Sequence, residues 1–275
     1  MDDKTQLARA TRFRDLHAGG TFVIANAWDG GSARILGSQG FTALATSSGA
    51  AAGTLGRLDG HITRFEALAH ARTICEATDL PVSADLEKGF GDAPADIAKT
   101  IRLAADAGLV GGSIEDSTGR KDAPIFDIGF ATERIAAAIE AARALPFPFT
   151  LTARAENFLN GRADLDDTIK RLQSYEKAGA DVLFAPGLPD LDAVRAVCQA
   201  VSKPVNFMVG IRGKSFSVAE LAAAGVRRIS LATSLYRAAM TGLVESAREI
   251  RESGTFGYVD RAMTSGEFAK HITGK

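Results

Sequence analysis

Two patterns of apolar and polar residues alternate along the chain. Short and almost uninterrupted apolar runs, such as TFVIANA (21–27) and PVSADLE (81–87), are typical of parallel strands covered on both faces. Between such runs, apolar residues recur with a period near 3.6, as for Ile97 and Ile101 in residues 94–107. The pattern therefore predicts strands that alternate with amphipathic helices.

Eight strands are predicted in this way. They cover residues 21–27, 41–48, 81–87, 110–115, 149–156, 181–187, 204–210 and 227–233. A further helix is predicted over 3–18, and a helical extension covers about 234–275. We expect a Gly- and Ala-rich loop up to Asp59 and an irregular polar loop over 116–131.

Three predicted helices end in Ala-Gly directly before a strand. The pairs are Ala107-Gly108, Ala178-Gly179 and Ala224-Gly225. Glycine at a helix end accepts the left-handed conformation that closes the helix, and the chain then enters the next strand. Pro81 and Pro204 stand at strand starts, where the missing N–H costs least.

Eight strand–helix units in about 250 residues is the count and size of a (β/α)8 barrel. An open doubly wound sheet is the alternative, and it would more often carry Gly-x-Gly-x-x-Gly after its first strand. The corresponding turn here, NAWDGGSA (26–33), lacks that pattern. Because no linker or low-complexity segment divides the chain, we predict one barrel domain over residues 1–275.

Composition narrows the function classes. The chain of 275 residues is 46% hydrophobic and 24% charged, with a net charge of −1, which argues against a nucleic-acid groove or a membrane surface as partner. No apolar run approaches the roughly 20 residues of a membrane span, and the N-terminus lacks the apolar core of a signal peptide. Cys75 and Cys198 lie in helical patterns and are expected to be reduced thiols. We expect a cytoplasmic protein.

Acidic residues follow three neighbouring strands. Asp59 comes after the second strand, Asp85 and Glu87 end the third, and Glu115 and Asp116 end the fourth. The ends of barrel strands meet at one face, and two carboxylates about 4 Å apart repel by roughly 4 kcal/mol at an effective dielectric constant near 20. Such a cluster needs protons, an arginine or a metal. Each acid alone could form a salt bridge or cap a helix, but the whole set favours a cation, and oxygen-only ligands favour Mg²⁺ or Mn²⁺ over zinc.

Other polar residues stand at the same strand ends. Arg154 ends the fifth strand, where it could pair with a substrate carboxylate or form an ion pair with Glu156 or Asp181. Asn206 interrupts an apolar strand and could face the site or bond to a neighbouring strand. The turn 47–49 is either an ordinary loop or an anion site built from backbone N–H groups.

Together these segments resemble the isocitrate lyase/phosphoenolpyruvate mutase superfamily, and the 2-methylisocitrate lyase branch most closely. The resemblance runs across nearly the whole chain, beginning with IANAWDGGSARILGSQGFTALATSSGAAAGTLGRLDG (24–60). DLEKGFGD (85–92) is similar to the Asp-x-Asp-x-Gly-x-Gly metal motif, and GGSIEDS (111–117) to the Ile-Glu-Asp motif. The later site segments are matched by TARAEN (152–157), PVNFM (204–208) and TSLYRAAM (233–240).

The resemblance implies a (β/α)8 barrel whose last helix is exchanged in a homodimer, usually within a homotetramer. It implies Mg²⁺ held by Asp85, Glu87 and Glu115, partly through water, with Asp59 nearby. It also implies that a small carboxylate is bound, by Ser47, Ser48, Gly49 and Arg154 on one side and by Asn206, Ser234 and Arg237 on the other. Arg154 and Asp59 are the residues expected to act in catalysis. The chemistry would pass through an enolate or oxyanion stabilised by the metal.

The sequence also departs from this family. The lyases carry a Lys-x-Cys-Gly-His loop after the fourth strand, whereas this chain has STGRKDAPIFDIG (117–129) with neither Cys nor His. The Asn-bearing loop of the phosphonomutases is absent as well. Glu87 replaces the family's second Asp, and Pro186 stands where the lyases place a substrate-binding Glu. A tricarboxylate should therefore bind poorly, and a small oxo acid such as oxaloacetate or pyruvate should fit better.

The sequence thus predicts a Mg²⁺-dependent carbon–carbon lyase or decarboxylase for a small α-oxo or 2-hydroxy carboxylate. One alternative is a phosphonopyruvate-type P–C mutase or hydrolase. Another is an α-oxo-acid-binding protein with weak turnover. Lys121, His61 and Tyr236 are candidate proton donors, although each is more often an ordinary surface or packing residue.

Overall fold

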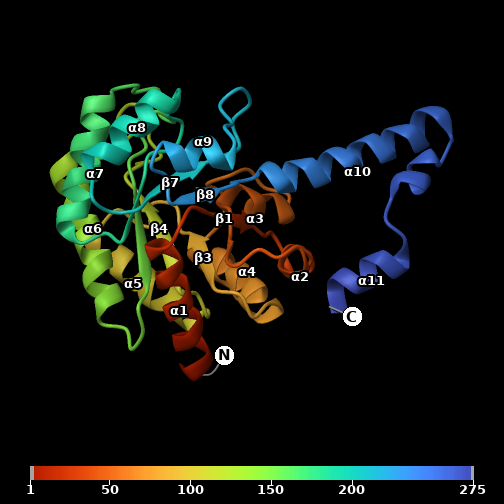
Figure 1. The fold of residues 1–275 in the computed structure, drawn as a ribbon, viewed down its shortest axis with the longest axis horizontal. Coiled ribbons are helices and arrows are strands. Elements are labelled where there is room, and N and C mark those ends of the chain that lie inside the picture. Colours follow the sequence, from red (N-terminus) through yellow and green to blue (C-terminus); the bar gives the residue numbers. More distant parts are fainter. Residues whose placement is uncertain (1–2, 274–275) are drawn as a thin grey trace.

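The computed structural model describes residues 3–273 and shows a closed barrel of eight parallel strands (Figure 1). The strands follow one another around the barrel in chain order, and β8 closes the sheet by pairing with β1. They are β1 (Phe22–Asn26), β2 (Leu44–Ala45), β3 (Val82–Asp85), β4 (Gly111–Glu115), β5 (Thr150–Arg154), β6 (Val182–Phe184), β7 (Val205–Met208) and β8 (Arg228–Ser230). The predicted (β/α)8 barrel is confirmed.

Helices surround this barrel and close one of its ends. They are α1 (Asp3–Ala18), α2 (Gly30–Ser38), α3 (Ser48–Thr54), α4 (Arg64–Ala77), α5 (Pro94–Asp106), α6 (Ile128–Arg143), α7 (Leu165–Ala178), α8 (Leu191–Ala200), α9 (Val218–Ala223) and α10 (Ser234–Ser253). A short 3₁₀ helix, η1 (Gly257–Arg261), and α11 (Ser265–Thr273) follow. As the Ala-Gly pairs predict, Gly108, Gly179 and Gly225 all have left-handed φ angles, between +94° and +107°.

Three local predictions are wrong. Only Leu44–Ala45 of the predicted strand 41–48 pairs as a strand, and the predicted Gly/Ala loop contains helix α3. The reason is that the Ser47 side chain caps this helix at Ala50 N, and the alanines that follow are good helix formers that become buried. The polar loop after β4 ends earlier than expected, because Asp127 caps α6.

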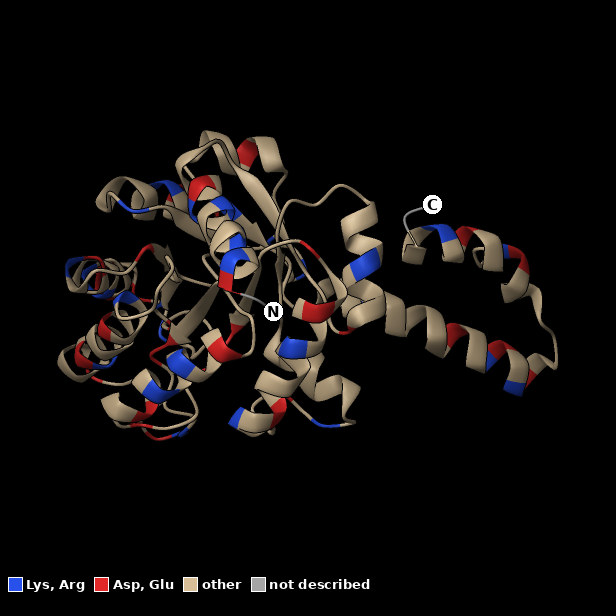
Figure 2. Ribbon diagram, turned by 90° about the horizontal axis from the view of Figure 1, so that it is seen from below, with Lys and Arg blue, Asp and Glu red and all other residues tan. Residues whose placement is uncertain are grey.

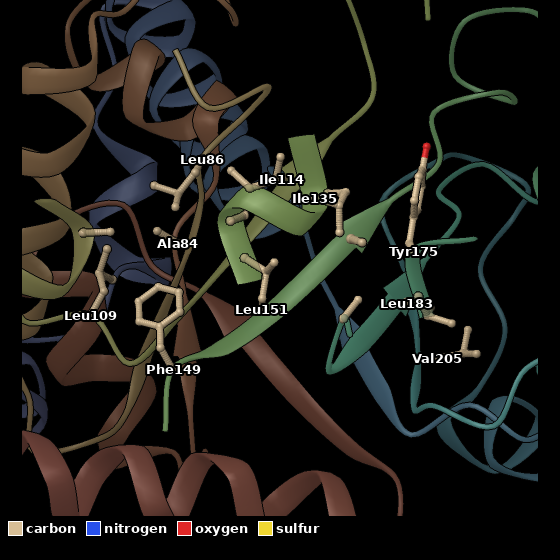
Figure 3. Close-up of a cluster of buried hydrophobic side chains, with 14 of the residues drawn as sticks. Ala84, Leu86, Leu109, Ile114, Ile135, Phe149, Leu151, Tyr175, Leu183 and Val205 are labelled. Carbon is tan, nitrogen blue, oxygen red and sulfur yellow. The ribbon is translucent and has the colours of Figure 1, made fainter. Parts of the chain in front are cut away.

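The main apolar core lies between the strands and the outer helices. Figure 3 shows part of it, with Ile114, Leu151 and Leu183 from the strands and Ile135 from α6. Inside the barrel, Gly111 leaves space for Phe13, because an added Cβ at Gly111 would lie 2.8 Å from the Phe13 ring. Phe13 belongs to α1, so the first helix is seated against the barrel strands.

The C-terminal segment forms an arm that projects from the barrel (Figures 1 and 2). Helix α10 has no buried residue over its twenty positions, and α11 returns to α2, where Arg34 Nη1 donates to the Ile272 carbonyl at 3.0 Å. Large apolar side chains are exposed along the arm: Leu243, Val244, Ile250, Phe256, Val259, Met263 and Phe268. None of the helices within residues 3–273 is both long and apolar enough to span a bilayer.

Candidate active site

A cleft of about 710 Å³ opens at the carboxyl ends of the strands. It collects most of the predicted site residues, namely Ser47, Ser48, Asp59, Asp85, Glu87, Glu115, Arg154 and Arg237. Asn206 lies along a smaller cavity of about 70 Å³ that shares several lining residues with the cleft. Ser234 does not line the cleft, since its hydroxyl donates to the Leu231 carbonyl at 2.6 Å, and the neighbouring Thr233 lines it instead.

Arg154 is the electrostatic centre of the cleft. Its guanidinium contacts three carboxylates: Asp85 at 2.9 Å, Glu115 at 3.2 Å and Glu156 at 2.9 Å. Burial alone would lower the pKa of Arg154, but Glu156, Asp85 and Glu115 outweigh it and raise the pKa well above its usual value. Arg154 therefore stays charged and ties together the ends of β3, β4 and β5. The ion pair with Glu156 considered from the sequence is present, whereas Asp181 pairs with Arg143.

Glu87 is a carboxylate without a counterion of its own. Its backbone has φ +50°, a left-handed conformation that is uncommon for a residue with a side chain and that often marks functional sites. Its Oε1 atom is buried and has no hydrogen-bond partner among residues 3–273. Burial, followed by the charges of Asp85 and Asp59, raises the pKa of Glu87 to about 7. A cation would relieve this site.

Two further acids beside Arg154 are held in an unfavourable environment. Burial raises the pKa of Glu115 well above its usual value and also raises that of Glu156, although Arg154 lowers both. With Asp85, three carboxylates thus share one guanidinium, and negative charge is in excess at the strand ends.

The donor set fits a hydrated divalent cation, although not a site of three direct ligands. Among residues 3–273, no three His, Cys, Asp or Glu side chains are placed to hold one ion directly. Mg²⁺ usually keeps several waters and takes only one or two protein carboxylates, and the orphaned oxygen of Glu87 offers one such ligand. The assignment of Asp85, Glu87 and Glu115 to a metal remains a prediction.

The turn from Ser47 to Gly49 lies beside these acids. Ser48 Oγ donates to Asp85 Oδ2 at 3.2 Å. The N–H groups of Ser48 and Gly49 belong to the first turn of α3 and so have no intrahelical acceptor. An added Cβ at Gly49 would lie 2.9 Å from Thr233 Cγ2 and 3.2 Å from Asp59 Oδ2, so that only glycine fits there.

One acid expected at the strand ends lies elsewhere. Asp116 is buried outside the cleft, where it accepts hydrogen bonds from Tyr175 Oη at 2.6 Å, Arg171 Nη1 at 3.0 Å and Glu156 N at 2.8 Å. The alternation of side chains along an extended chain turns Asp116 away from the face that Glu115 occupies. Asp116 therefore holds the backbone of Glu156 in place and does not face a substrate or metal in the cleft.

Arg134 was not predicted from the sequence, yet it holds the acidic loop, residues 85–92, in place. Its fully buried guanidinium donates to the carbonyls of Asp92, Glu115, Gly91 and Lys88, the last through a short hydrogen bond. Arg134 lies on the core face of α6, where the helical period predicts an apolar residue. A charged residue at such a position is the sequence signal that could have identified it.

None of the three proposed proton donors lines the cleft. Lys121 and His61 are exposed, and Tyr236 packs against Gly53 and the Trp28 ring. Lys88 does line the cleft, with Nζ 2.6 Å from Asp92 Oδ1 and donating to the Thr118 carbonyl. Its place directly after Glu87 was the sequence signal for it.

Asn206 combines the two roles that its sequence position left open. Its Oδ1 accepts from Arg228 Nε at 2.8 Å and its amide donates to Ser230 Oγ at 3.0 Å, so it bonds to the neighbouring strand while also lining the smaller cavity.

Comparisons with known proteins agree with this geometry. Residues 13–251 match the phosphoenolpyruvate phosphomutase family model. The chain is 30% identical to Escherichia coli 2-methylisocitrate lyase over 82% of this chain and 79% of that protein, and 30% identical to Pseudomonas entomophila oxaloacetate decarboxylase over 86% and 82%. A solved Burkholderia cenocepacia structure, provisionally named a lyase/mutase, superposes with a TM-score of 0.96 at 52% identity, covering 98% of each chain. The protein therefore belongs to the phosphoenolpyruvate phosphomutase family and is an enzyme of the isocitrate lyase/PEP mutase superfamily.

Proposed function

We propose that this enzyme is a Mg²⁺-dependent carbon–carbon lyase or decarboxylase acting on a small α-oxo or 2-hydroxy carboxylate, with Mn²⁺ as a possible substitute. The observation that carries the proposal is the buried oxygen of Glu87, which has no hydrogen-bond partner among the described residues. The negative charges of Asp85 and Asp59 repel this carboxylate, and Arg154 lines the same cleft. This combination favours the binding of a cation together with an anionic substrate.

In this proposal, the excess carboxylates provide the oxygen ligands. Asp85, Glu87 and Glu115 would hold the ion, partly through water, with Asp59 beside them. When bound, the ion would supply Lewis-acid stabilisation of negative charge on a substrate oxygen. Glu87 must lose its proton before it can bind, which couples loading to pH near 7.

The cations and N–H groups of the cleft would hold the substrate carboxylates. Arg154, Arg237 and Ser48 line the cleft, and the N–H groups of Ser48 and Gly49, in the first turn of α3, have no intrahelical acceptor. Arg237 Nη2 at present donates to the Gly210 carbonyl at 2.5 Å, an exposed contact that a substrate carboxylate could replace. Lys88, between Glu87 and Gly89 in the sequence, lines the cleft and is the side chain that we assign to proton transfer. Asn206 would orient the substrate from the smaller cavity inside the barrel.

The substrate would be a small diacid. Oxaloacetate suits the cleft better than a tricarboxylate, because Pro186 offers no polar group where the lyases of this family place a Glu, and an oxaloacetate decarboxylase is among the relatives. A screen of di- and tricarboxylates with Mg²⁺, followed by detection of pyruvate and glyoxylate, tests this assignment.

The matched variants for this screen are Asp85→Asn, which acts in the cleft, and Asp106→Asn, at the exposed end of α5. We expect Asp85→Asn to lower turnover at least 100-fold and Asp106→Asn to leave it unchanged. Turnover that survives in Asp85→Asn would exclude the proposed site. Tight Mg²⁺-dependent binding of an oxo acid without product would instead identify a binding protein.

A second candidate reaction is P–C bond chemistry on phosphonopyruvate, because the matching family model is that of a phosphomutase. Incubation with phosphonopyruvate and Mg²⁺ would then move the phosphorus NMR resonance. An unchanged spectrum together with turnover of oxaloacetate would exclude P–C bond chemistry and support the lyase or decarboxylase assignment.

We further propose that two copies of the chain associate through the C-terminal arm, with the last helix exchanged, and that they pair again into a homotetramer in the cytoplasm. The support is that α10 has no buried residue and that its apolar side chains Leu243 and Val244 are more than half exposed. Exposed apolar side chains that lie together favour contact with another chain. Light scattering should show the oligomer for the native chain and a smaller species for Leu243→Asp/Val244→Asp. A monomeric native chain would contradict this assembly.

A further inference from the structure

The smaller cavity, inside the barrel, holds a positive charge that no acid balances. The cavity has a volume of about 70 Å³ and opens to the cleft, because Asp85, Arg154, Met208 and Ala232 line both. Arg228, the first residue of β8, lines it from the barrel interior and is only 5% exposed.

Within the described chain, the side-chain hydrogen-bond partners of Arg228 are all neutral. Its Nε donates to Asn206 Oδ1 at 2.8 Å and its Nη2 to Thr152 Oγ1 at 2.8 Å. Its Nη1 lies 3.4 Å from Nε2 of His17, whose Nδ1 is 2.8 Å from the Phe13 carbonyl and so carries the proton. Burial, and then Arg228 itself, lowers the pKa of His17 to about 3, which keeps the imidazole neutral.

This arrangement is costly. A buried ion without a partner of opposite charge loses solvation that hydrogen bonds to neutral groups do not restore. Burial lowers the pKa of Arg228 to about 9, so the guanidinium is still mostly protonated at neutral pH. A guanidinium has five N–H donors, of which three are engaged here.

Other donors surround the same space. Ser83 and Ser113 also line the cavity, and neither hydroxyl forms a hydrogen bond within the described part of the chain. Ser230 Oγ accepts from Asn206, so its own proton is left for the cavity. The one acid at the cavity, Asp85, is already bound to Arg154 and Ser48. The lining therefore offers positive charge and O–H donors in excess of acceptors.

We propose that this cavity binds a monovalent inorganic anion of chloride's size, held between Arg228 and the hydroxyls of Ser83, Ser113 and Ser230. Water needs roughly 10–15 Å³ of such space per molecule, so the cavity accommodates the ion together with water. Water alone would satisfy the hydroxyls but would leave the charge of Arg228 unbalanced. The anion would act as a fixed counterion and support Asn206 from beneath the cleft.

Bromide gives a direct test, because its anomalous scattering identifies it in a crystal. Crystals of the protein grown without substrate or metal and soaked in sodium bromide should show a peak inside the barrel beside Arg228. Arg228→Met should lose the peak, whereas Arg227→Met, which changes the adjacent exposed arginine, should keep it. Bromide found only on the surface of the native protein would overturn the proposal.

Thermal unfolding supplies a second measurement that needs no crystal. Replacing gluconate by chloride at constant ionic strength should raise the unfolding midpoint of the native chain and of Arg227→Met by about 5 °C when chloride is roughly 30-fold above its Kd. A chloride effect of equal size in Arg228→Met, or none in the native chain, would refute the site. If Arg228→Met does not fold, the native bromide peak and the native chloride shift decide the question. Neither readout involves the proposed lyase activity, so the two proposals fail separately.

Discussion

Replacing Glu87 by glutamine should stabilise the protein while it abolishes function. In the metal-free protein, burial and the charges of Asp85 and Asp59 raise the pKa of Glu87 from 4.5 to about 7. The folded state therefore holds a proton that the unfolded state releases above pH 4.5. The contribution of the neutral carboxyl is fully present below pH 4.5 and is lost as the pH rises through about 7.

The size of this effect follows from the same pKa. A rise from 4.5 to about 7 corresponds to roughly 3 kcal/mol, and because Glu87 is only partly buried we expect about 2 kcal/mol. Glutamine mimics the neutral form, and no protein hydrogen bond to Oε1 is lost. Glu87→Gln should thus raise the free energy of unfolding by about 2 kcal/mol at pH 8 and change it little at pH 4.5.

Urea unfolding at both pH values, in the presence of EDTA, measures this difference. Glu133→Gln, on the exposed side of α6, is the matched control and should leave stability unchanged at both. Excess Mg²⁺ should reverse the order at pH 8, because it stabilises the native chain by binding and has a weaker site in the variant. A Glu87→Gln protein that is no more stable than the native chain at pH 8 in EDTA would refute the reasoning.

Three further substitutions test the supports of the site. Arg134→Met should cost about 3–5 kcal/mol in urea unfolding, because it leaves buried carbonyls of the acidic loop without donors; a loss below 1 kcal/mol would contradict this role. Tyr175→Phe should cost about 1–3 kcal/mol by the same measurement, since Asp116 loses its 2.6 Å hydrogen bond, and an unchanged midpoint would show the bond to be dispensable. Gly53→Ala should cost about 1–3 kcal/mol in thermal unfolding, because the new Cβ would lie 2.7 Å from the Tyr236 ring; equal stability would mean that α10 shifts freely.

The fold was predictable because several independent signals agreed. The apolar strands, the helical periods and the Ala-Gly helix ends all indicated the same alternation of strands and helices, and Gly108, Gly179 and Gly225 adopt the conformation expected of them. Helix α3 was not predictable from its composition, since the six small residues after Ser47, SGAAAG, are as compatible with a flexible loop as with a buried helix.

Most residues that line the cleft were predictable from the sequence, but the ion pairs among them were not. Asp85, Glu87 and Glu115 were predicted from their positions at strand ends, and all three line the cleft. Which of them Arg154 neutralises depends on the stagger between β3, β4 and β5, which no local pattern records. For the same reason the separation of Asp116 from Glu115 became clear only in three dimensions.

The seating of α1 has a consequence for how the protein is made. This helix precedes every barrel strand in chain order, yet Gln6 donates to the carbonyls of Ala105 and Leu109, and His17 reaches Arg228, 211 positions later in the chain. Its docking surface is therefore finished only when the last strand has been synthesised. Until then α1 lacks part of the surface against which it packs, so partially translated chains are more exposed to aggregation and to chaperone capture than the finished fold.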